Sequence, residues 1–227
     1  MQFKMKAAIS IIFMIILPTG FASADEAKSA AQLISKAEIT VDQMLNHPKY
    51  GDVIRARMKN AKAVFIAPQI FKGGFFLGGE GGKGILLARA ENGEWSYPAF
   101  YYFGAASFGL QFGAQASELF MIIQTGKGLT AIMDNNFKAG GDLSAAVGLI
   151  GEGMESGTTT NLKADIMTYS IAKGAFIGAS VEGAVIVPDE GLNTGYYSAG
   201  ATSKKIVLEG QHRNAQADNL RSALTKF

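Results

Sequence analysis

The spacing of hydrophobic residues changes from a helical period to a strand period near residue 63. Over residues 25–46 the apolar side chains recur every three or four positions, which predicts an amphipathic helix with a narrow stripe of small residues. Pro48 ends this helix, because the residue before a proline avoids the α region. A second, short helix is predicted over residues 50–61, with Val53, Ile54 and Met58 on its apolar side.

Beyond residue 63, glycine, aromatic and β-branched residues dominate and the apolar period becomes two. A first short strand is predicted to stop at Pro68. The predicted strands include residues 64–67, 107–115, 118–125, 137–151 and 174–187. Roughly six to eight strands joined by short turns favour antiparallel pairing. Helices are also predicted over residues 127–134, 190–196 and 214–226.

These elements predict an α+β fold in which N-terminal helices pack on a glycine-rich, mostly antiparallel curved sheet or small barrel, with a C-terminal helix. Glycine weakens ordinary strands, so its abundance here indicates strong curvature or close approach of another backbone. Four segments follow from this pattern: a leader over residues 1–24, a helical segment over 25–62, a β-rich domain over 63–210 and a helical tail over 211–227.

The first residues have the pattern of a secretory signal peptide. Lys4 and Lys6 precede a short apolar run over residues 7–17, and Ala22-Ser23-Ala24 forms a small-residue cleavage site. The run is shorter than the ~20 residues that span a bilayer, although an uncleaved N-terminal anchor is the alternative. We therefore expect export to the periplasm or the extracellular space, with possible peripheral contact with a membrane.

Basic residues concentrate in one part of the chain. Residues 49–89 contain Asp52 and Glu80 as their only acids, whereas residues 91–160 are predominantly acidic. This asymmetry predicts either ordinary solvated surface or a cationic face for an anionic partner. Spacing i, i+4 and i+7 would place three residues on one helical face: Arg55, Lys59 and Lys62. Weaker candidates are Lys72, Lys83 and Arg89, of which the last two share one side of a regular strand.

The sequence offers little catalytic chemistry. The stretch GEGGKG matches G-x-G-x-x-G at Gly79, Gly81 and Gly84, but a strand pattern follows it where a dinucleotide-binding loop needs a helix. There is no cysteine, and the two histidines lie near opposite ends of the chain. The tetrapeptide SIAK at residues 170–173 lacks the other motifs of penicillin-recognising enzymes. We expect no enzyme activity, no metal and no cofactor.

Aromatic residues cluster over residues 95–103. They predict either a packed core with the rim of the sheet or a belt of rings at a membrane interface. Removal of Lys4 and Lys6 with the leader would leave the chain with no net charge, because 19 acidic residues remain. A neutral exported protein is not expected to bind nucleic acid.

Several longer motifs occur in a distinctive order. They are AKAVFIAP, GGEGGKGILLAR, GEWSYPAFYYFGAASFGLQFGAQ, FKAGGDLSAAVG and YSIAKGAFIGASVEGAVIVPD. In this order they resemble the SYLF domain, also called the Ysc84-type actin-binding domain, from about Ala30 to Gly210. The family blocks correspond to residues 95–98, 109–113, 140–148 and 173–183.

The resemblance implies a non-enzymatic domain that binds anionic phospholipids, including phosphoinositides, through a basic amphipathic N-terminal helix. This role falls here on residues 50–62, in agreement with the charge asymmetry. In eukaryotic members the family also implies actin binding and attached SH3 or FYVE domains. Bacterial members are typically exported, so actin is not expected as a partner of this chain. The alternative is a structural or protein-interaction factor of the cell envelope.

Overall fold

The computed structural model describes residues 20–74, 77–108, 115–134, 147–150, 164–172 and 184–226. Most of the predicted leader lies outside these residues. So do the glycine block at residues 109–113, most of the block at 140–148 and the block at 173–183.

Two helices open the described part of the chain. Helix α1 (Gly20–Leu45) begins before the predicted start and buries its small-residue stripe, including Ala30, Ala37 and Val41. Helix α2 (Gly51–Met58) follows after a turn. In this turn His47 Nδ1 accepts hydrogen bonds from the backbone amides of residues 49 and 50. Among the described helices, none combines the length and apolar character that crossing a bilayer requires.

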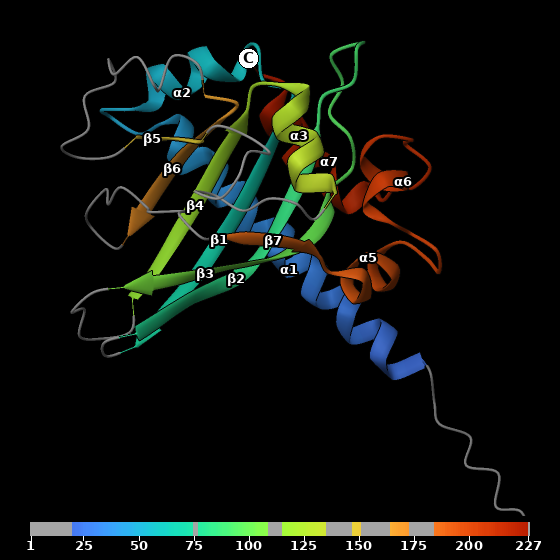
Figure 1. Cartoon of the computed structure of the whole chain (residues 1–227). Helices are drawn as coiled ribbons and strands as arrows, with labels where there is room; N and C mark the ends of the chain where they lie inside the picture. The colour runs from blue at the N-terminus through green and yellow to red at the C-terminus, as the bar shows by residue number, and fades with distance from the viewer. Residues whose placement is uncertain are drawn as a thin grey trace, which may run out of the picture.

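The strands form one sheet in the order β5-β6-β4-β1-β2-β3-β7 (Figure 1). Their bounds are β1 Ala63–Gly74, β2 Leu77–Ala88, β3 Ala99–Phe108, β4 Gln115–Ile123, β5 Val147–Ile150, β6 Ile166–Ala172 and β7 Val185–Pro188. Among the described strand pairs, only β5–β6 is parallel. Because β5 and β7 stand at opposite edges, the described strands make an open sheet. The predicted α+β class is confirmed. Of the two predicted forms, a curved sheet or a small barrel, the described strands form the sheet.

The sequence predicted that Pro68 ends the first strand, and this prediction is wrong. Strand β1 continues through it, and the pairing with both β2 and β4 shifts register between residues 66 and 70. Proline cannot donate to a ladder, and a β-bulge leaves one residue unpaired, so the bulge accommodates Pro68 inside a central strand.

Helices cover both faces of the sheet. One core lies under α1, α2, α5 (Glu190–Tyr196) and α7 (Asp218–Leu224) and includes Phe100, Phe120 and Trp95. The opposite core lies under α3 (Gly126–Met133) and α6 (Ser203–Val207). Figure 1 shows α1 behind the sheet and α3 in front. The predictions for α3, α5 and the C-terminal helix are confirmed, whereas α6 was not predicted because a five-residue helix has no measurable period.

The glycines of residues 79–84 belong to strand β2 of a hairpin, and no helix follows them. A Cβ on Gly82 would overlap the Gln69 carbonyl oxygen and lie 3.3 Å from Ile70 Cα. A Cβ on Gly84 would overlap the Phe65 ring. Close packing across the β1–β2 pair therefore explains Gly82 and Gly84, and the G-x-G-x-x-G match lies within a strand.

Candidate functional site

Arg55 holds the first two helices together. Its guanidinium donates to the Leu45 carbonyl at the end of α1 and pairs with Asp52 on α2. The side chain is half-buried in this role. Arg55 is therefore mainly a structural residue, although the sequence placed it in the anion-binding face.

The predicted face of Arg55, Lys59 and Lys62 is wrong as a helical face. Helix α2 ends at Met58, with Lys59 as its C-cap. Lys62 leads into β1, and its backbone amide donates to the Ile123 carbonyl at 2.8 Å. Both lysines are nonetheless exposed, and neither pairs with a carboxylate in the described part of the chain.

Arg57 is a third cation of this segment. It lies on α2, is half-buried, and its carbonyl accepts from the Gln124 amide at 3.2 Å. The sequence reasoning passed over Arg57 because it does not share the i, i+4, i+7 spacing. We call Arg57, Lys59 and Lys62 the basic end of α2.

Arg89 fixes the position of that basic end. Its Nη1 donates to the carbonyls of Met58 at 3.3 Å and Lys59 at 2.9 Å, the last carbonyls of α2. Its guanidinium stacks on the Trp95 ring with a separation of 4.8 Å to the ring centroid. Burial lowers the pKa of Arg89. These contacts make it a positioning residue for α2, since guanidinium groups bond the orphan carbonyls at a helix C-terminus favourably.

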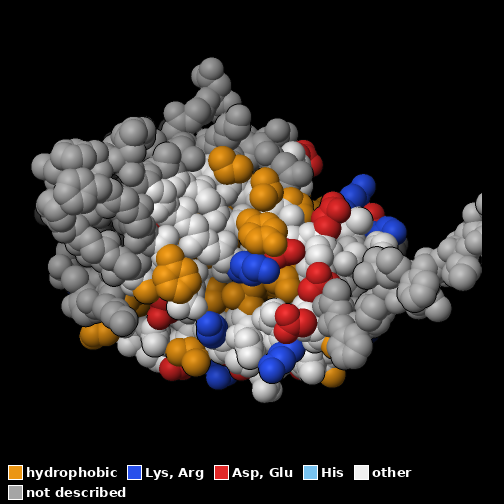
Figure 2. All heavy atoms as spheres, turned by 90° about the horizontal axis from the view of Figure 1, so that it is seen from below, with side chains coloured by type: hydrophobic (Ala, Val, Ile, Leu, Met, Phe, Trp, Pro, Cys, Tyr) orange, Lys and Arg blue, Asp and Glu red, His pale blue; other side chains and the backbone are white. Residues whose placement is uncertain are grey.

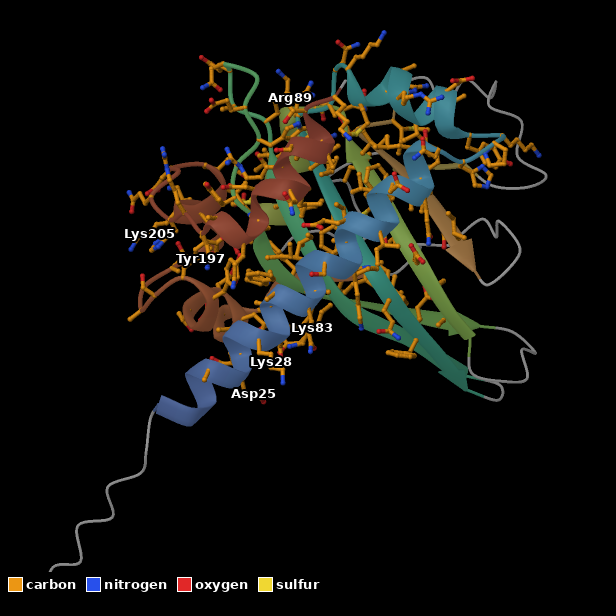
Figure 3. All side chains as sticks on the ribbon, turned by 180° about the vertical axis from the view of Figure 1, so that it is seen from behind. Asp25, Lys28, Lys83, Arg89, Tyr197 and Lys205 are labelled. Atoms are coloured by element: carbon orange, nitrogen blue, oxygen red, sulfur yellow. The ribbon has the colours of Figure 1, made fainter. Side chains whose placement is uncertain are left out.

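Lys83 lies far from that group. Arg89 stands six positions later, or about 20 Å away along an extended strand at ~3.3 Å per residue. Figure 3 shows Arg89 near the top of the view and Lys83 well below it. Lys83 Nζ pairs with Asp189 Oδ2 at 2.9 Å and lies 5.0 Å from the Tyr102 ring centroid. Burial lowers the pKa of Lys83, but hydrogen bonding and attraction from Asp189 outweigh burial and raise it above its usual range.

A hollow lies beside Lys83, between α1 and the β1–β2 hairpin. Its volume is about 260 Å³, and its lining consists of Ser29, Gln32, Leu33, Lys36, Gln69, Phe71, Gly82 and Lys83. Lys36 Nζ donates to Gln69 Oε1 at 2.9 Å and so connects α1 to the sheet. We call this feature the α1 hollow. No local pattern marks Lys36, because its partner stands 33 residues later and only the fold joins them. The Lys72 side chain lies outside the described residues; its backbone pairs with Glu80.

The aromatic cluster is mostly core. Trp95, Phe100, Tyr101 and Phe103 are buried, which favours the packing interpretation for them. Tyr102 is the exception at 45% exposure, and Phe71 on β1 is 58% exposed. Figure 2 shows hydrophobic and basic side chains side by side on one face of the molecule. Within the described residues, no group of three metal-ligating side chains converges.

The fold and these surfaces define an α+β domain with two cationic candidate sites, the basic end of α2 and the α1 hollow. The family model Ysc84, described as the Las17-binding protein actin regulator, matches residues 104–227. The chain therefore belongs to the Ysc84 (SYLF) family.

Similar proteins include the SH3 domain-containing YSC84-like protein 1 of Homo sapiens and of Bos taurus. Each is 30% identical over 204 residues, which cover 89% of this chain and 58% of the relative. LAS seventeen-binding protein 3 of Saccharomyces cerevisiae is 30% identical over 159 residues, which cover 69% of this chain and 34% of the relative. The chain thus spans under two thirds of the length of these relatives. The names of the first two relatives state that they contain an SH3 domain, and the name of the third states that it binds Las17.

Proposed function

We propose that this chain is a non-enzymatic, exported domain that associates with anionic phospholipid membranes through the basic end of α2. The observation that carries the proposal is a set of cations without ion pairs: Arg57, Lys59 and Lys62 lie within six residues, and no described carboxylate pairs with them. Cations that are not neutralised within the protein remain available to phosphate groups at a membrane surface.

The expected attraction is moderate and depends on salt. Each basic residue near an anionic surface contributes about 1 kcal/mol, so the three together supply about 3 kcal/mol, or roughly a hundredfold in affinity. The contribution falls off within a Debye length of about 8 Å at physiological ionic strength. The anchoring of α2 by Arg55 and Arg89 supports this role, because it keeps the basic end in a fixed orientation.

Co-sedimentation tests the proposal with two kinds of vesicle: phosphatidylcholine alone, and phosphatidylcholine with one-fifth phosphatidylglycerol. We expect binding to the anionic vesicles only. The double variant Lys59→Gln/Lys62→Gln should weaken it by about 2 kcal/mol, or roughly thirtyfold. The control Lys204→Gln/Lys205→Gln changes net charge equally but lies on α6. Negligible binding to both vesicles, or equal loss in the control, contradicts the proposal.

A protein partner in the cell envelope is the second candidate. The names of the family and of its relatives connect them to protein partners. Phe71 and Tyr102 are exposed apolar side chains that suit such a contact. Export would separate this chain from cytoplasmic actin. Pull-down with Lys59→Glu/Lys62→Glu distinguishes the candidates: a captured partner persists in this variant if the second candidate is correct, whereas vesicle binding disappears.

A further inference from the structure

We propose that the α1 hollow receives the phosphate ester of a single lipid headgroup, between Lys36 and Lys83, while Phe71 enters the apolar layer beside it. This inference rests on the proposed membrane function and adds a second, stereospecific contact to the diffuse attraction of α2. Lys36, Phe71 and Lys83 come from α1, β1 and β2, so the site exists only in the folded protein.

The charge of the hollow suits a phosphate. Among the described residues, its lining includes two lysines, three polar uncharged side chains and no carboxylate. In the described part of the chain, Lys36 Nζ donates only to the neutral Gln69 amide oxygen, which a ligand oxygen can replace. Lys83 is paired with Asp189, but its side chain is 42% exposed while that of Asp189 is 4% exposed. An ammonium group has three donors, so the exposed side of Lys83 can donate to a ligand while Asp189 keeps its bond.

The size of the hollow suits a headgroup better than a whole lipid. Sites that enclose a drug-sized ligand measure about 300–1,000 Å³, and the hollow falls just below that range at about 260 Å³. A phosphate ester with its first few carbon atoms is an appropriate occupant. The acyl chains would then remain outside, in the bilayer.

The rim of the hollow explains why the ester belongs to a lipid. Strand register aligns Gln69, Lys83, Tyr102 and Val187 in one row across β1, β2, β3 and β7. The adjacent row is Phe71, Gly81, Gly104 and Val185. Every large apolar residue in these two rows is exposed, from Val187 at 37% to Phe71 at 58%.

The two central positions of the second row are glycines. Gly81 and Gly104 supply no side chain, and a Cβ built on Gly104 meets no atom of the described residues within 4 Å. The apolar residues at its two ends are three strand spacings apart, or about 14 Å at ~4.8 Å each. A free, fully hydrated phosphate ester would gain nothing from this exposed apolar rim, whereas a lipid carries the apolar chains that cover it.

The test uses Phe71→Trp as a reporter in the full chain. The native Trp95 is only 2% exposed and therefore changes little on binding. With vesicles containing one-fifth phosphatidylglycerol, we expect a blue shift of the introduced indole, and none with phosphatidylcholine alone. Adding Lys36→Gln should weaken this response about fivefold, the effect of one basic residue near an anionic surface. The matched control is Lys28→Gln, an exposed lysine two turns earlier on α1 and outside the lining.

Glycerol 3-phosphate serves as the soluble competitor, at an ionic strength matched with sodium chloride. We expect it to reduce the vesicle response more than chloride does. An equal effect of the two salts, or equal loss in Lys28→Gln and Lys36→Gln, overturns the headgroup site. Tight binding of glycerol 3-phosphate without any vesicle response overturns the lipid assignment in favour of a free phosphate ester.

The outcomes separate the two proposals. If the protein binds anionic vesicles, loses binding in Lys59→Gln/Lys62→Gln and shows no indole shift, the headgroup site fails and the membrane function stands. If the protein binds no vesicle at all, the membrane function itself fails.

Discussion

Gly82→Ala tests whether the glycines of β2 serve packing or phosphate binding. The new methyl group would overlap the Gln69 carbonyl oxygen and lie 3.2 Å from its carbonyl carbon and 3.3 Å from Ile70 Cα. All three atoms belong to the backbone of β1, in the bulge that accommodates Pro68. No side-chain rotation relieves this overlap, so one of two central strands must shift.

The magnitude follows from two opposing effects. Overpacking a well-packed site costs about 1–3 kcal/mol, and a backbone obstacle belongs at the upper end of that range. Replacing glycine with alanine returns about 0.4–1 kcal/mol, because the unfolded chain has less entropy to lose. We therefore expect a net destabilisation of about 2 kcal/mol. For a chain of this size that lowers Tm by about 4–8 °C.

Urea unfolding followed by Trp95 fluorescence measures the change, because Trp95 is buried and is the only tryptophan. Gly104→Ala is the matched control: within the part of the chain that the structure describes, its Cβ meets nothing within 4 Å, so we expect it to be neutral or stabilising by about 0.5 kcal/mol. Equal stabilities of the two variants would refute the packing argument. A loss of anion binding in Gly82→Ala at unchanged stability would instead assign Gly82 to phosphate binding, since it also lines the α1 hollow.

Three further predictions concern single contacts. Arg89→Lys should lower the urea midpoint by the equivalent of about 1–2 kcal/mol, because an ammonium cannot both bond the two α2 carbonyls and stack on the indole; an unchanged midpoint contradicts the positioning role. Asp189→Asn keeps the N-cap of α5 but removes the charge beside Lys83. Because the pair raises the folded-state pKa of Lys83, its stabilisation is complete below the unfolded value of about 10.4 and disappears as pH rises through the folded value. The stability difference between parent and variant should therefore be constant at neutral pH and shrink above about pH 10, and a difference that persists at high pH contradicts the pairing. Thr40→Val removes a buried hydroxyl that donates to Glu118 Oε2 at 2.7 Å and should reduce the unfolding free energy by about 1.5–3 kcal/mol in urea titration; a smaller change than that of the exposed Ser35→Ala indicates that the bond contributes nothing.

The elements that could be predicted are those with a long period or a strong boundary signal. The stripe of α1 is visible because it spans many repeats of the helical period, and β4 is visible because its apolar run is unbroken. Pro68 misled the strand assignment, because a proline reads as a strand end unless a bulge is known to accommodate it. Helix α6 has five residues, and its N-cap Thr202 is its main local signal.

The candidate site also has a part that the sequence predicts and a part that only the structure shows. The excess of basic residues over 49–89 is a property of the sequence, and it predicts either solvated surface or a face for an anionic partner. The individual roles are not visible there. Arg55, Lys83 and Arg89 look alike as cations, yet one holds two helices together, one pairs with Asp189 and one bonds the last carbonyls of α2.

By itself, the sequence determined the α+β class, the family motifs and the location of the positive charge, because periodicity and composition act over short distances along the chain. Only the tertiary structure decided which cations are paired within the protein and which can bind an external anion. It brings Lys36 to Gln69 and Lys83 to Asp189, across 33 residues in the first case. Pairing between charges depends on distances of a few ångströms in space, and chain spacing does not fix those distances until the helices pack on the sheet.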